Sequence, residues 1–418
     1  MIKLAHGELI VLLLSISAML IISRIFAELG KKLKLPVVMG ELIVGIILGP
    51  TIFGMIYPET FNYMFPRTGN VPIAMDGIFS LSVIMLLFVA GMEVQLSLVL
   101  KQGKVAVYTS LFSMVIPFFT GFAVAWFFPE IFSISDEHGP KLLFSLFFGT
   151  ALSISALPVI ARILMDMNIF KTNVGMVIIA SAMFNDLIGW LIFSFILSLT
   201  NTSSHNDGFG LWYTIAYILG FGLFMLTIGK KIIDKTLPWM QTKLSWPGGV
   251  LSISLGICLL SAAFTESIHI HAILGAFIAG IAIGDSVHLR EQAREIIHQF
   301  VTNFFAPLFF VSIGLKVNFI ENFDPMIVAI VLVLAFVGKV LGAFIGARIG
   351  GMNKNQALAV GFGMNARGAM EIILGTLALN AGLISKPIFV ALVIMALVTS
   401  ITSGPLIKRF LDRNMESK

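Results

Sequence analysis

The chain has 418 residues, of which 58% are hydrophobic and only 12% are charged. A soluble domain carries about 25% charged residues, so this composition excludes an ordinary soluble fold and requires a surface that faces lipid. The formal net charge of +5 does not indicate nucleic-acid binding, because cytoplasmic loops of membrane proteins are rich in Lys and Arg. The single cysteine excludes a disulfide framework and a cysteine-based metal site.

Apolar stretches of about 20 residues, the length that crosses the hydrocarbon core, follow one another along the chain. They cover residues 8–28, 36–57, 76–95, 104–128, 142–165, 172–200, 211–229, 248–264, 268–286, 298–317, 325–350, 355–381 and 387–409. With the N-terminus outside, twenty of the 27 Lys and Arg residues lie at cytoplasmic ends and loops and five lie outside. The sequence therefore predicts an all-α polytopic membrane protein with 13 transmembrane helices, N-out and C-in.

A glycine pattern occurs twice. Residues 40–49 and 275–284 both read G-x-x-I-x-G-I-x-x-G, and weaker matches follow in the same order at 91–94 with 314–317 and at 148–149 with 362–363. The matches pair spans 2, 3 and 5 with spans 9, 10 and 12, so the copies run in opposite directions across the membrane. Inverted repeats are typical of transporters. Chance matching of Gly and Ile is the alternative, and the unchanged order of the matches favours the repeat.

Ionisable groups deep in a span are costly and are candidates for function. Asn185 and Asp186 lie near the middle of span 172–200. A carboxylate holds either a proton or a hard alkali cation. The alternative is a carboxyl that only bonds a neighbouring helix, which Asn or Ser does at a lower desolvation cost. Lys339 lies at mid-depth in span 325–350, and Asp186 is the most centrally placed candidate partner for its ammonium group.

Span 355–381 carries a second pair of charges, Arg367 and Glu371, four residues apart. If the segment is helical they lie on one face and neutralise each other. A charge pair that braces a broken helix is favoured here over direct ion binding.

Span 142–165 contains Pro158, which opposes an intact helix. The hydroxyls of Thr150, Ser153 and Ser155 and the freed carbonyls are then candidate cation ligands. A simple proline kink with hydroxyls bonded back to the backbone is the alternative. Interrupted helices at corresponding positions of two halves point to a transport site.

Other kinds of site find little support. Glu266, His269 and His271 cluster at the start of span 268–286 but are interpreted as interfacial polar residues. Walker, dinucleotide-binding and HExxH motifs are absent from the sequence. We therefore expect no cofactor, and no metal beyond a transported monovalent cation.

Several motifs in this order resemble one family. They are Asn185-Asp186 with Gly189-Trp190, Gly338-Lys339, Asn365-Ala366-Arg367-Gly368 with Glu371, and Leu35-Pro36 before the Gly40–Pro50 stretch. The chain resembles, over essentially all its length, the second monovalent cation:proton antiporter family. That family includes bacterial Na⁺/H⁺ and K⁺/H⁺ antiporters, Kef-type and spore-germination proteins and plant CHX exchangers.

The resemblance implies two crossed discontinuous helices, spans 142–165 and 355–381, in an elevator-type homodimer of the cell membrane, here expected to be a bacterial inner membrane. Asp186 would bind the cation, Na⁺ or K⁺, and the proton, with Lys339 as its competing partner. The implied domains are dimerisation helices in 1–103 and 248–324, core helices in 104–200 and 325–409, a linker in 201–247 and a tail in 410–418.

Two departures from the family qualify this interpretation. Electrogenic members carry two adjacent aspartates, whereas Asn185 comes first here, so we expect electroneutral exchange. Kef-type proteins continue into a cytoplasmic domain, and this sequence stops at Lys418, which fits a short member or a truncated chain. A proton-independent gated K⁺ efflux pathway is the nearest alternative, followed by an organic-anion symporter. An intramembrane enzyme is disfavoured because Asp186 has no second aspartate in a matching span.

Overall fold

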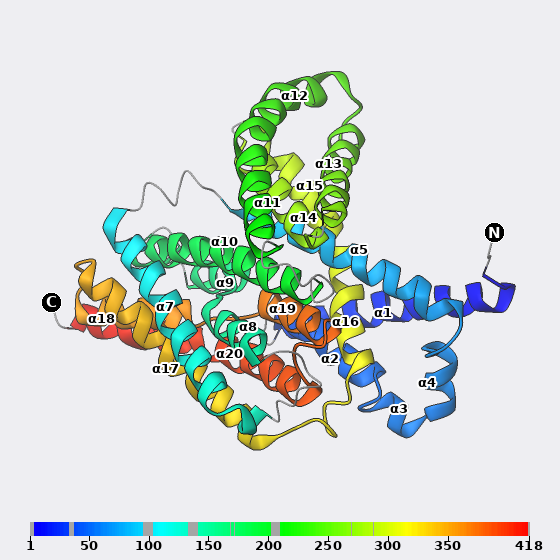
Figure 1. The fold of residues 1–418 in the computed structure, drawn as a ribbon, viewed down its shortest axis with the longest axis horizontal. Coiled ribbons are helices and arrows are strands. Elements are labelled where there is room, and N and C mark those ends of the chain that lie inside the picture. The colour runs from blue at the N-terminus through cyan, green and yellow to red at the C-terminus, as the bar shows by residue number, and fades with distance from the viewer. Residues whose placement is uncertain are drawn as a thin grey trace. The chain divides into compact units, whose positions relative to one another are not determined.

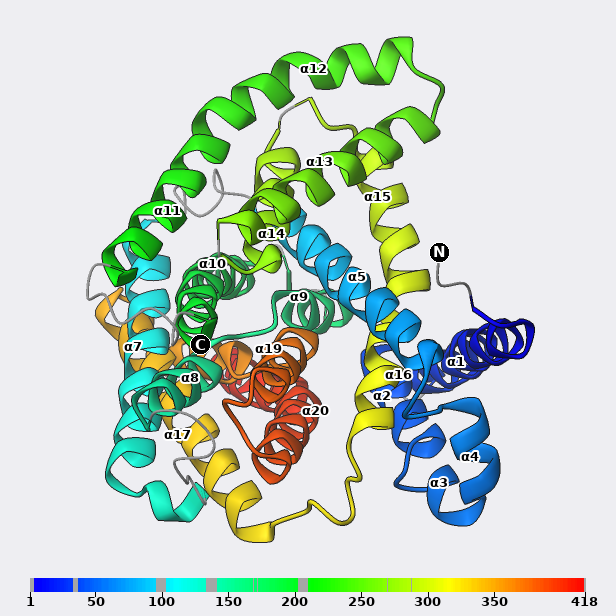
Figure 2. The ribbon, with the colours of Figure 1, turned by 45° about the vertical axis from the view of Figure 1, so that its right-hand side comes forward.

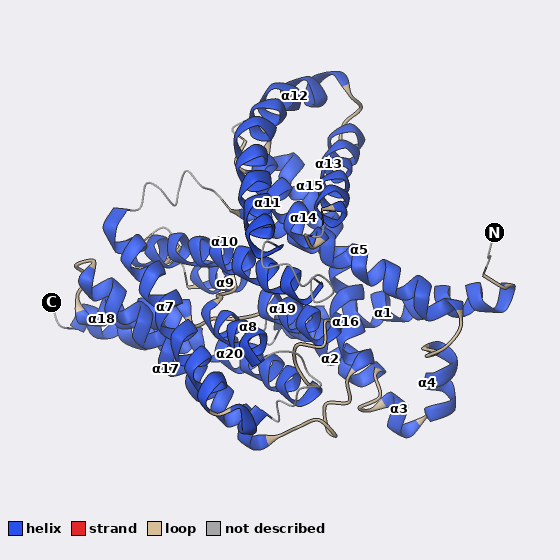
Figure 3. Ribbon diagram, viewed as in Figure 1, coloured by secondary structure: helices blue, strands red, loops and turns tan. Residues whose placement is uncertain are grey.

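The computed structural model describes residues 4–32, 37–94, 103–132, 141–167, 169–170, 172–201, 210–268, 270–286 and 288–416. Within these ranges the chain forms helices joined by loops, without strands (Figure 3). Among the described residues, ten helices are long and apolar enough to cross a membrane, or eleven if one bent pair is counted as a span. Predicted spans 142–165 and 268–286 contain shorter apolar helices. The helical multi-span architecture is thus confirmed, while the count of 13 and the orientation stay predictions.

The chain divides into two compact units, each built from two separate segments (labels in Figure 1). Unit 1 comprises Met1–Val94 and Leu219–Asn322, and unit 2 comprises Gln95–Ile218 and Phe323–Lys418. The boundary between the two units falls at Leu219, within the predicted linker 201–247. The dimerisation and core roles of the predicted domains stay predictions.

The helices of unit 1 come from the first and third parts of the chain. They are α1 (His6–Lys32), α2 (Val37–Leu48), α3 (Phe53–Ile56), α4 (Pro58–Met64), α5 (Asn70–Glu93), the π-helical turn η3 (Met225–Gly229), α12 (Lys230–Lys243), α13 (Gly248–Ser267), α14 (Ala272–Gly284), α15 (Glu291–Phe300), the π-helical turn η4 (Val301–Phe305) and α16 (Ala306–Lys316). Helix α11 (Gly210–Phe224) joins unit 2 to unit 1 along the chain.

Glycines let the helices of unit 1 approach closely. Helix α2 packs on α16 and α5 packs on α14. A Cβ atom added at Gly280 would lie 2.1 Å from the carbonyl oxygen of Phe88, and one at Gly314 would lie 2.0 Å from the carbonyl carbon of Gly45. Small residues at such crossings maximise van der Waals contact where lipid provides no hydrophobic drive. The predicted repeat matches α2 to α14 and α5 to α16. It therefore converts the α2–α16 pair into the α14–α5 pair, and the presence of both pairs supports the repeat.

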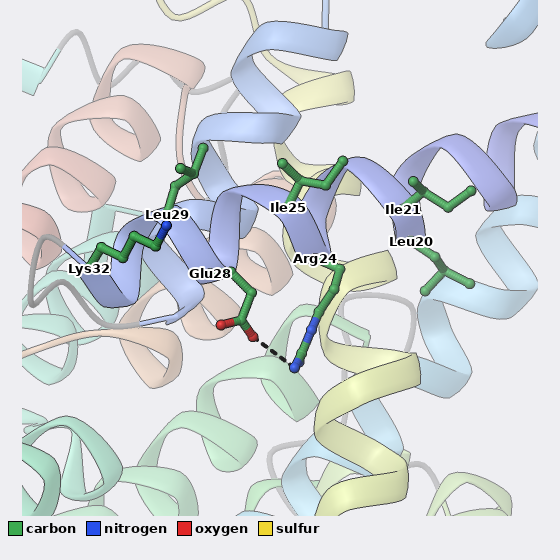
Figure 4. Close-up of a pocket in the computed structure, with 7 residues that line it drawn as sticks. All are labelled: Leu20, Ile21, Arg24, Ile25, Glu28, Leu29 and Lys32. Atoms are coloured by element: carbon green, nitrogen blue, oxygen red, sulfur yellow. Dashed lines mark ion pairs between the residues drawn. The ribbon is translucent and has the colours of Figure 1, made fainter.

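Helix α1 keeps one apolar face uncovered within unit 1. Figure 4 shows this strip, with Leu20, Ile21 and Ile25 beside an ion pair of 2.8 Å between Arg24 and Glu28. Ile21 and Ile25 are both more than half exposed. An apolar helix face of this kind suits contact with lipid.

Unit 2 carries the interrupted helices. Its elements are α7 (Gly103–Phe127), η1 (Pro129–Phe132), α8 (Lys141–Ser153), α9 (Leu157–Asp166), α10 (Asn173–Asn201), α17 (Pro325–Ile349), α18 (Lys354–Met364), α19 (Ala369–Asn380) and α20 (Lys386–Glu416). Helices α7 and α17 lie side by side in Figures 1 and 2.

A stripe of glycines at every fourth position of α17 faces α7. A Cβ at Gly342 would lie 2.4 Å from the carbonyl oxygen of Phe112, and one at Gly346 would lie 2.3 Å from that of Tyr108. Gly338 meets Pro117 in the same way, at 3.1 Å. This small-xxx-small stripe brings the two backbones together and places Lys339, the neighbour of Gly338, inside unit 2.

The close crossing of α5 and α14 makes a testable prediction. Gly280→Ala forces a Cβ into the α5 backbone, and we expect overpacking to lower the free energy of unfolding by about 1–3 kcal/mol. The matched control is Gly256→Ala in α13, where an added Cβ meets nothing within 4 Å; this change should be neutral or stabilising by up to about 1 kcal/mol. Apparent melting temperatures of the purified proteins in detergent measure both effects, and equal shifts would contradict the crossing.

Candidate functional site

Both predicted helix interruptions occur, and they meet. Helix α8 ends at Ser153 and α9 begins at Leu157, with Pro158 in its first turn, where proline lacks only a hydrogen bond that the helix end does not need. Helices α18 and α19 are bent by 43° at the break between them. The Ser155 hydroxyl donates to the Met364 carbonyl (2.9 Å) and the Ala156 amide donates to the Ala366 carbonyl (3.1 Å). The two interruptions are therefore hydrogen-bonded to each other.

Arg367 binds the end of α8. Its guanidinium donates to the carbonyls of Ala151 (2.7 Å) and Leu152 (2.5 Å), and the side chain is fully buried. The last carbonyls of a helix have no helical donor and carry its negative dipole end. Arg367 supplies both the missing donors and a positive charge, and it reaches the end of α8 from the interruption between α18 and α19.

Glu371 lies at the start of a helix, whereas Arg367 binds the end of one. Its Oε2 atom accepts from the Gly368 amide at 2.7 Å and so caps the first turn of α19, where a negative charge favours the helix dipole. The predicted charge pair of Arg367 and Glu371 stays a prediction. The hydrogen bonds of both side chains go to main-chain groups. Arg367 lies in the non-helical stretch before Ala369, so a spacing of four does not by itself place both residues on one helix face.

Lys339 binds the third of the carbonyls at the end of α8. It is fully buried, and its ammonium donates to the carbonyl of Ser153, which follows directly after Ala151 and Leu152. The charges of Arg367, Glu371 and Asp186 all act on it. The ammonium group also lies 3.1 Å from the Asn185 amide oxygen when the nitrogen of that amide is turned towards Ser110.

Asn185 connects Lys339 to α7. With the amide nitrogen towards the Ser110 hydroxyl (2.7 Å), its oxygen accepts from the Ser113 hydroxyl (2.9 Å) and lies 3.1 Å from Lys339 Nζ. The reversed amide would turn its nitrogen towards an ammonium group, which has donors only. Asn185 thus presents a neutral oxygen to a cation, and the adjacent Asp186, 3% exposed, supplies a carboxylate in the same helix.

The three predicted hydroxyl ligands lie at the interruption but already have carbonyl partners. Thr150 donates to Leu146 (2.7 Å), Ser153 to Gly149 (2.7 Å) and Met114 (3.0 Å), and Ser155 to the second interruption. Their oxygen lone pairs stay available, so their role as cation ligands stays a prediction. The main-chain oxygen of Ser153, which holds Lys339, is the more directly placed ligand.

Sequence reasoning missed the serines that hold Asn185. Ser110 and Ser113 lie three residues apart in α7 and are both buried. Two hydroxyls at this spacing in an apolar span share one helix face, and that was the available signal. His269 lies outside the described residues, Glu266 accepts from the Ala272 amide (2.8 Å), and the described residues hold no cluster of three metal-binding side chains.

Comparison with known proteins identifies relatives. A family described as sodium/hydrogen exchanger, transmembrane, matches residues 16–413. The Na(+)/H(+) antiporter NhaS4 of Synechocystis is 31% identical over 405 residues, which are 96% of this chain and 97% of the relative. The K(+)/H(+) antiporter 1 of Saccharomyces cerevisiae is 31% identical over 90% of this chain. The chain spans only 43% of that yeast protein and 48% of the similar Cation/H(+) antiporter 17 of Arabidopsis thaliana.

A solved structure shares the fold. The sodium proton antiporter MjNhaP1 from Methanocaldococcus jannaschii superposes with a TM-score of 0.66 over 96% of each chain, at 18% identity. This likeness supports the arrangement of the helices and nothing finer.

The role of Arg367 can be tested by substitution. Arg367→Met leaves two buried carbonyls without donors, at about 1–3 kcal/mol each, so we expect a loss of about 2–6 kcal/mol in the free energy of unfolding. Arg367→Lys keeps the positive charge but lacks the planar guanidinium that reaches both carbonyls. Its loss in the free energy of unfolding should therefore be smaller than that of Arg367→Met but not zero. The control is Arg348→Met, whose exposed side chain donates to Met352; its effect should stay within about 0.5 kcal/mol. Denaturant titration in detergent measures all three, and equal losses for Arg367→Met and Arg348→Met would contradict the assignment.

Proposed function

This chain belongs to the transmembrane sodium/hydrogen exchanger family, and from that premise we propose that it exchanges a monovalent cation, Na⁺ or K⁺, for protons across a membrane. The observation that carries the proposal is Asp186, a carboxylate buried in α10 and adjacent in the chain to Asn185, whose amide oxygen faces the buried Lys339 ammonium group. Oxygen ligands of this kind suit a hard alkali cation, and the carboxylate also accepts a proton.

The mechanism follows from a competition for oxygen atoms. Lys339 rests on the Ser153 carbonyl and faces the Asn185 oxygen. An incoming cation needs such neutral oxygens together with the charge of Asp186. We propose that it displaces the ammonium group from them, and that protonation of Asp186 releases the cation again. Lys339 then acts as a tethered substitute for the cation, which keeps the buried oxygens satisfied while the site is without its substrate.

The construction of unit 2 supports an elevator-type movement. Asp186, Lys339, Arg367 and Glu371 all belong to unit 2, as do their main-chain partners. A site contained in one compact unit can be carried across as a body, with the hydrogen-bonded interruptions keeping its shape. Unit 1 is then the dimerisation domain of a homodimer, in the inner membrane of a bacterium.

The first test is Asp186→Asn in proteoliposomes with an imposed pH gradient. Asparagine keeps the shape but neither titrates nor supplies charge, so cation-driven proton movement should fall to the rate of empty liposomes, for Na⁺, K⁺, Li⁺ and Rb⁺ alike. The control is Asp324→Asn at the N-cap of α17, because Asn caps helices equally well. Wild-type turnover in purified Asp186→Asn would refute the assignment. Cation flux in the wild type that moves no protons would favour a gated K⁺ pathway instead.

Competition at one carboxylate also fixes a pH dependence. Where Asp186 becomes protonated, the apparent cation KM should rise by up to about tenfold for each unit of falling pH, because a proton must leave before the cation binds. The rate should pass through a maximum, since proton release fails at the acidic end and proton uptake at the alkaline end. Initial rates over a matrix of pH and cation concentration measure this, and a KM independent of pH would argue against a shared site.

We further propose that the exchange is electroneutral. Asp186 offers one titrating carboxylate, because Asn185 cannot titrate, and a Lys339 that keeps its proton leaves the site with the same charge for either ion. A membrane potential alone, at equal pH and equal cation on both sides, should then drive no net proton movement. Proton movement that follows the sign of the potential, and that is lost in Asp186→Asn, would show that a second proton moves.

A further inference from the structure

Asn365 has a buried side chain with no partner at either end. Its relative exposure is 0%, and neither Oδ1 nor Nδ2 makes a hydrogen bond to the described residues. An amide buried in this way forfeits the hydrogen bonds it makes in water, which is costly. Native structures rarely tolerate such a group unless something else satisfies it.

Hydrogen bonds to other parts of unit 2 hold the main chain on both sides of Asn365 in place. The Met364 carbonyl accepts from Ser155, the Ala366 carbonyl accepts from the Ala156 amide, and the Arg367 carbonyl accepts from Ser400. Each of these three carbonyls is held by another part of unit 2, so the backbone that carries the amide is fixed at the junction of the two interruptions.

The two ends of the Asn365 amide identify the ligand. Oδ1 is an acceptor and Nδ2 is a donor, and neither bonds to the described residues. A bare alkali cation would satisfy Oδ1 but repel the NH₂ group, and an anion would satisfy the NH₂ group alone. Water both donates and accepts, so it serves both ends.

We infer that Asn365 holds buried water at the interruption between α18 and α19. Ser155 and Ala156 connect this interruption directly to the one after α8, where the Ser153 carbonyl holds Lys339. In a membrane-embedded unit, such water satisfies polar groups that lipid cannot. It also places a polarisable neutral ligand at the crossing, where a cation has lost much of its own hydration.

Radiolytic hydroxyl-radical labelling tests the inference, because radicals made from bound water oxidise adjacent methionines. Met364, next to Asn365 along the chain and part of an apolar cluster of unit 2, and Met19, in an apolar cluster of unit 1, are both fully buried. In the wild-type protein Met364 should be oxidised several times faster than Met19. Asn365→Leu, similar in size but apolar, should reduce Met364 to the rate of Met19, whereas Asn365→Ser should keep it labelled.

Three outcomes would overturn the inference: equal rates at Met364 and Met19 in the wild type, unchanged labelling in Asn365→Leu, or labelling that disappears when Na⁺ or K⁺ is added. The wild-type comparison decides even if Asn365→Leu fails to fold. One consequence rests on the proposed function: loss of this ligand in Asn365→Leu should raise the cation KM about tenfold. Transport that is absent in the wild type would refute the proposed function and leave the labelling result standing.

Discussion

The interior of unit 2 depends on main-chain carbonyls that are free because a helix stops inside the protein. Ala151, Leu152 and Ser153 end α8, and their carbonyls accept from two buried cations, Arg367 and Lys339. The first interruption also donates to the second. In an unbroken helix the Ala156 amide would donate to the Leu152 carbonyl, whereas here it donates to the Ala366 carbonyl. Without this arrangement each interruption would expose backbone polar groups to a medium without water.

The buried charges are arranged by the polarity of helix ends as well as by pairing. Arg367 lies at a negative end and Glu371 at a positive end. Both charges are thus committed to the scaffold, which leaves Asp186 and Lys339 as the pair whose relationship can change with the bound ion. This division of labour explains how four ionisable groups share one apolar unit while the proposed chemistry requires only two of them.

Much of this arrangement was accessible from sequence, for identifiable reasons. Pro158 and the Asn365–Gly368 stretch break helical hydrogen bonding locally, so both interruptions were predictable. The main-chain partners of Arg367 were not predictable. Its spacing of four from Glu371 indicates a shared helix face only in a continuous helix, and the helix is interrupted at residues 365–368. The bond from Asn185 to the serines of α7 joins residues 72 and 75 positions apart, and no local pattern specifies such a contact.

The three carbonyls at the end of α8 have a consequence for genetics. Their oxygens belong to the backbone, so every amino acid at positions 151, 152 and 153 supplies the same atoms. A scan of side-chain substitutions would therefore detect the effect of removing Arg367 or Lys339, but it would not remove the main-chain oxygens that bind them. Selection likewise acts on these oxygens only through the shape of the chain, so changes of side chain at positions 151 and 152 can leave the electrostatic function in place. Replacing single amide linkages with esters, which weakens one carbonyl at a time, would make these atoms visible to experiment.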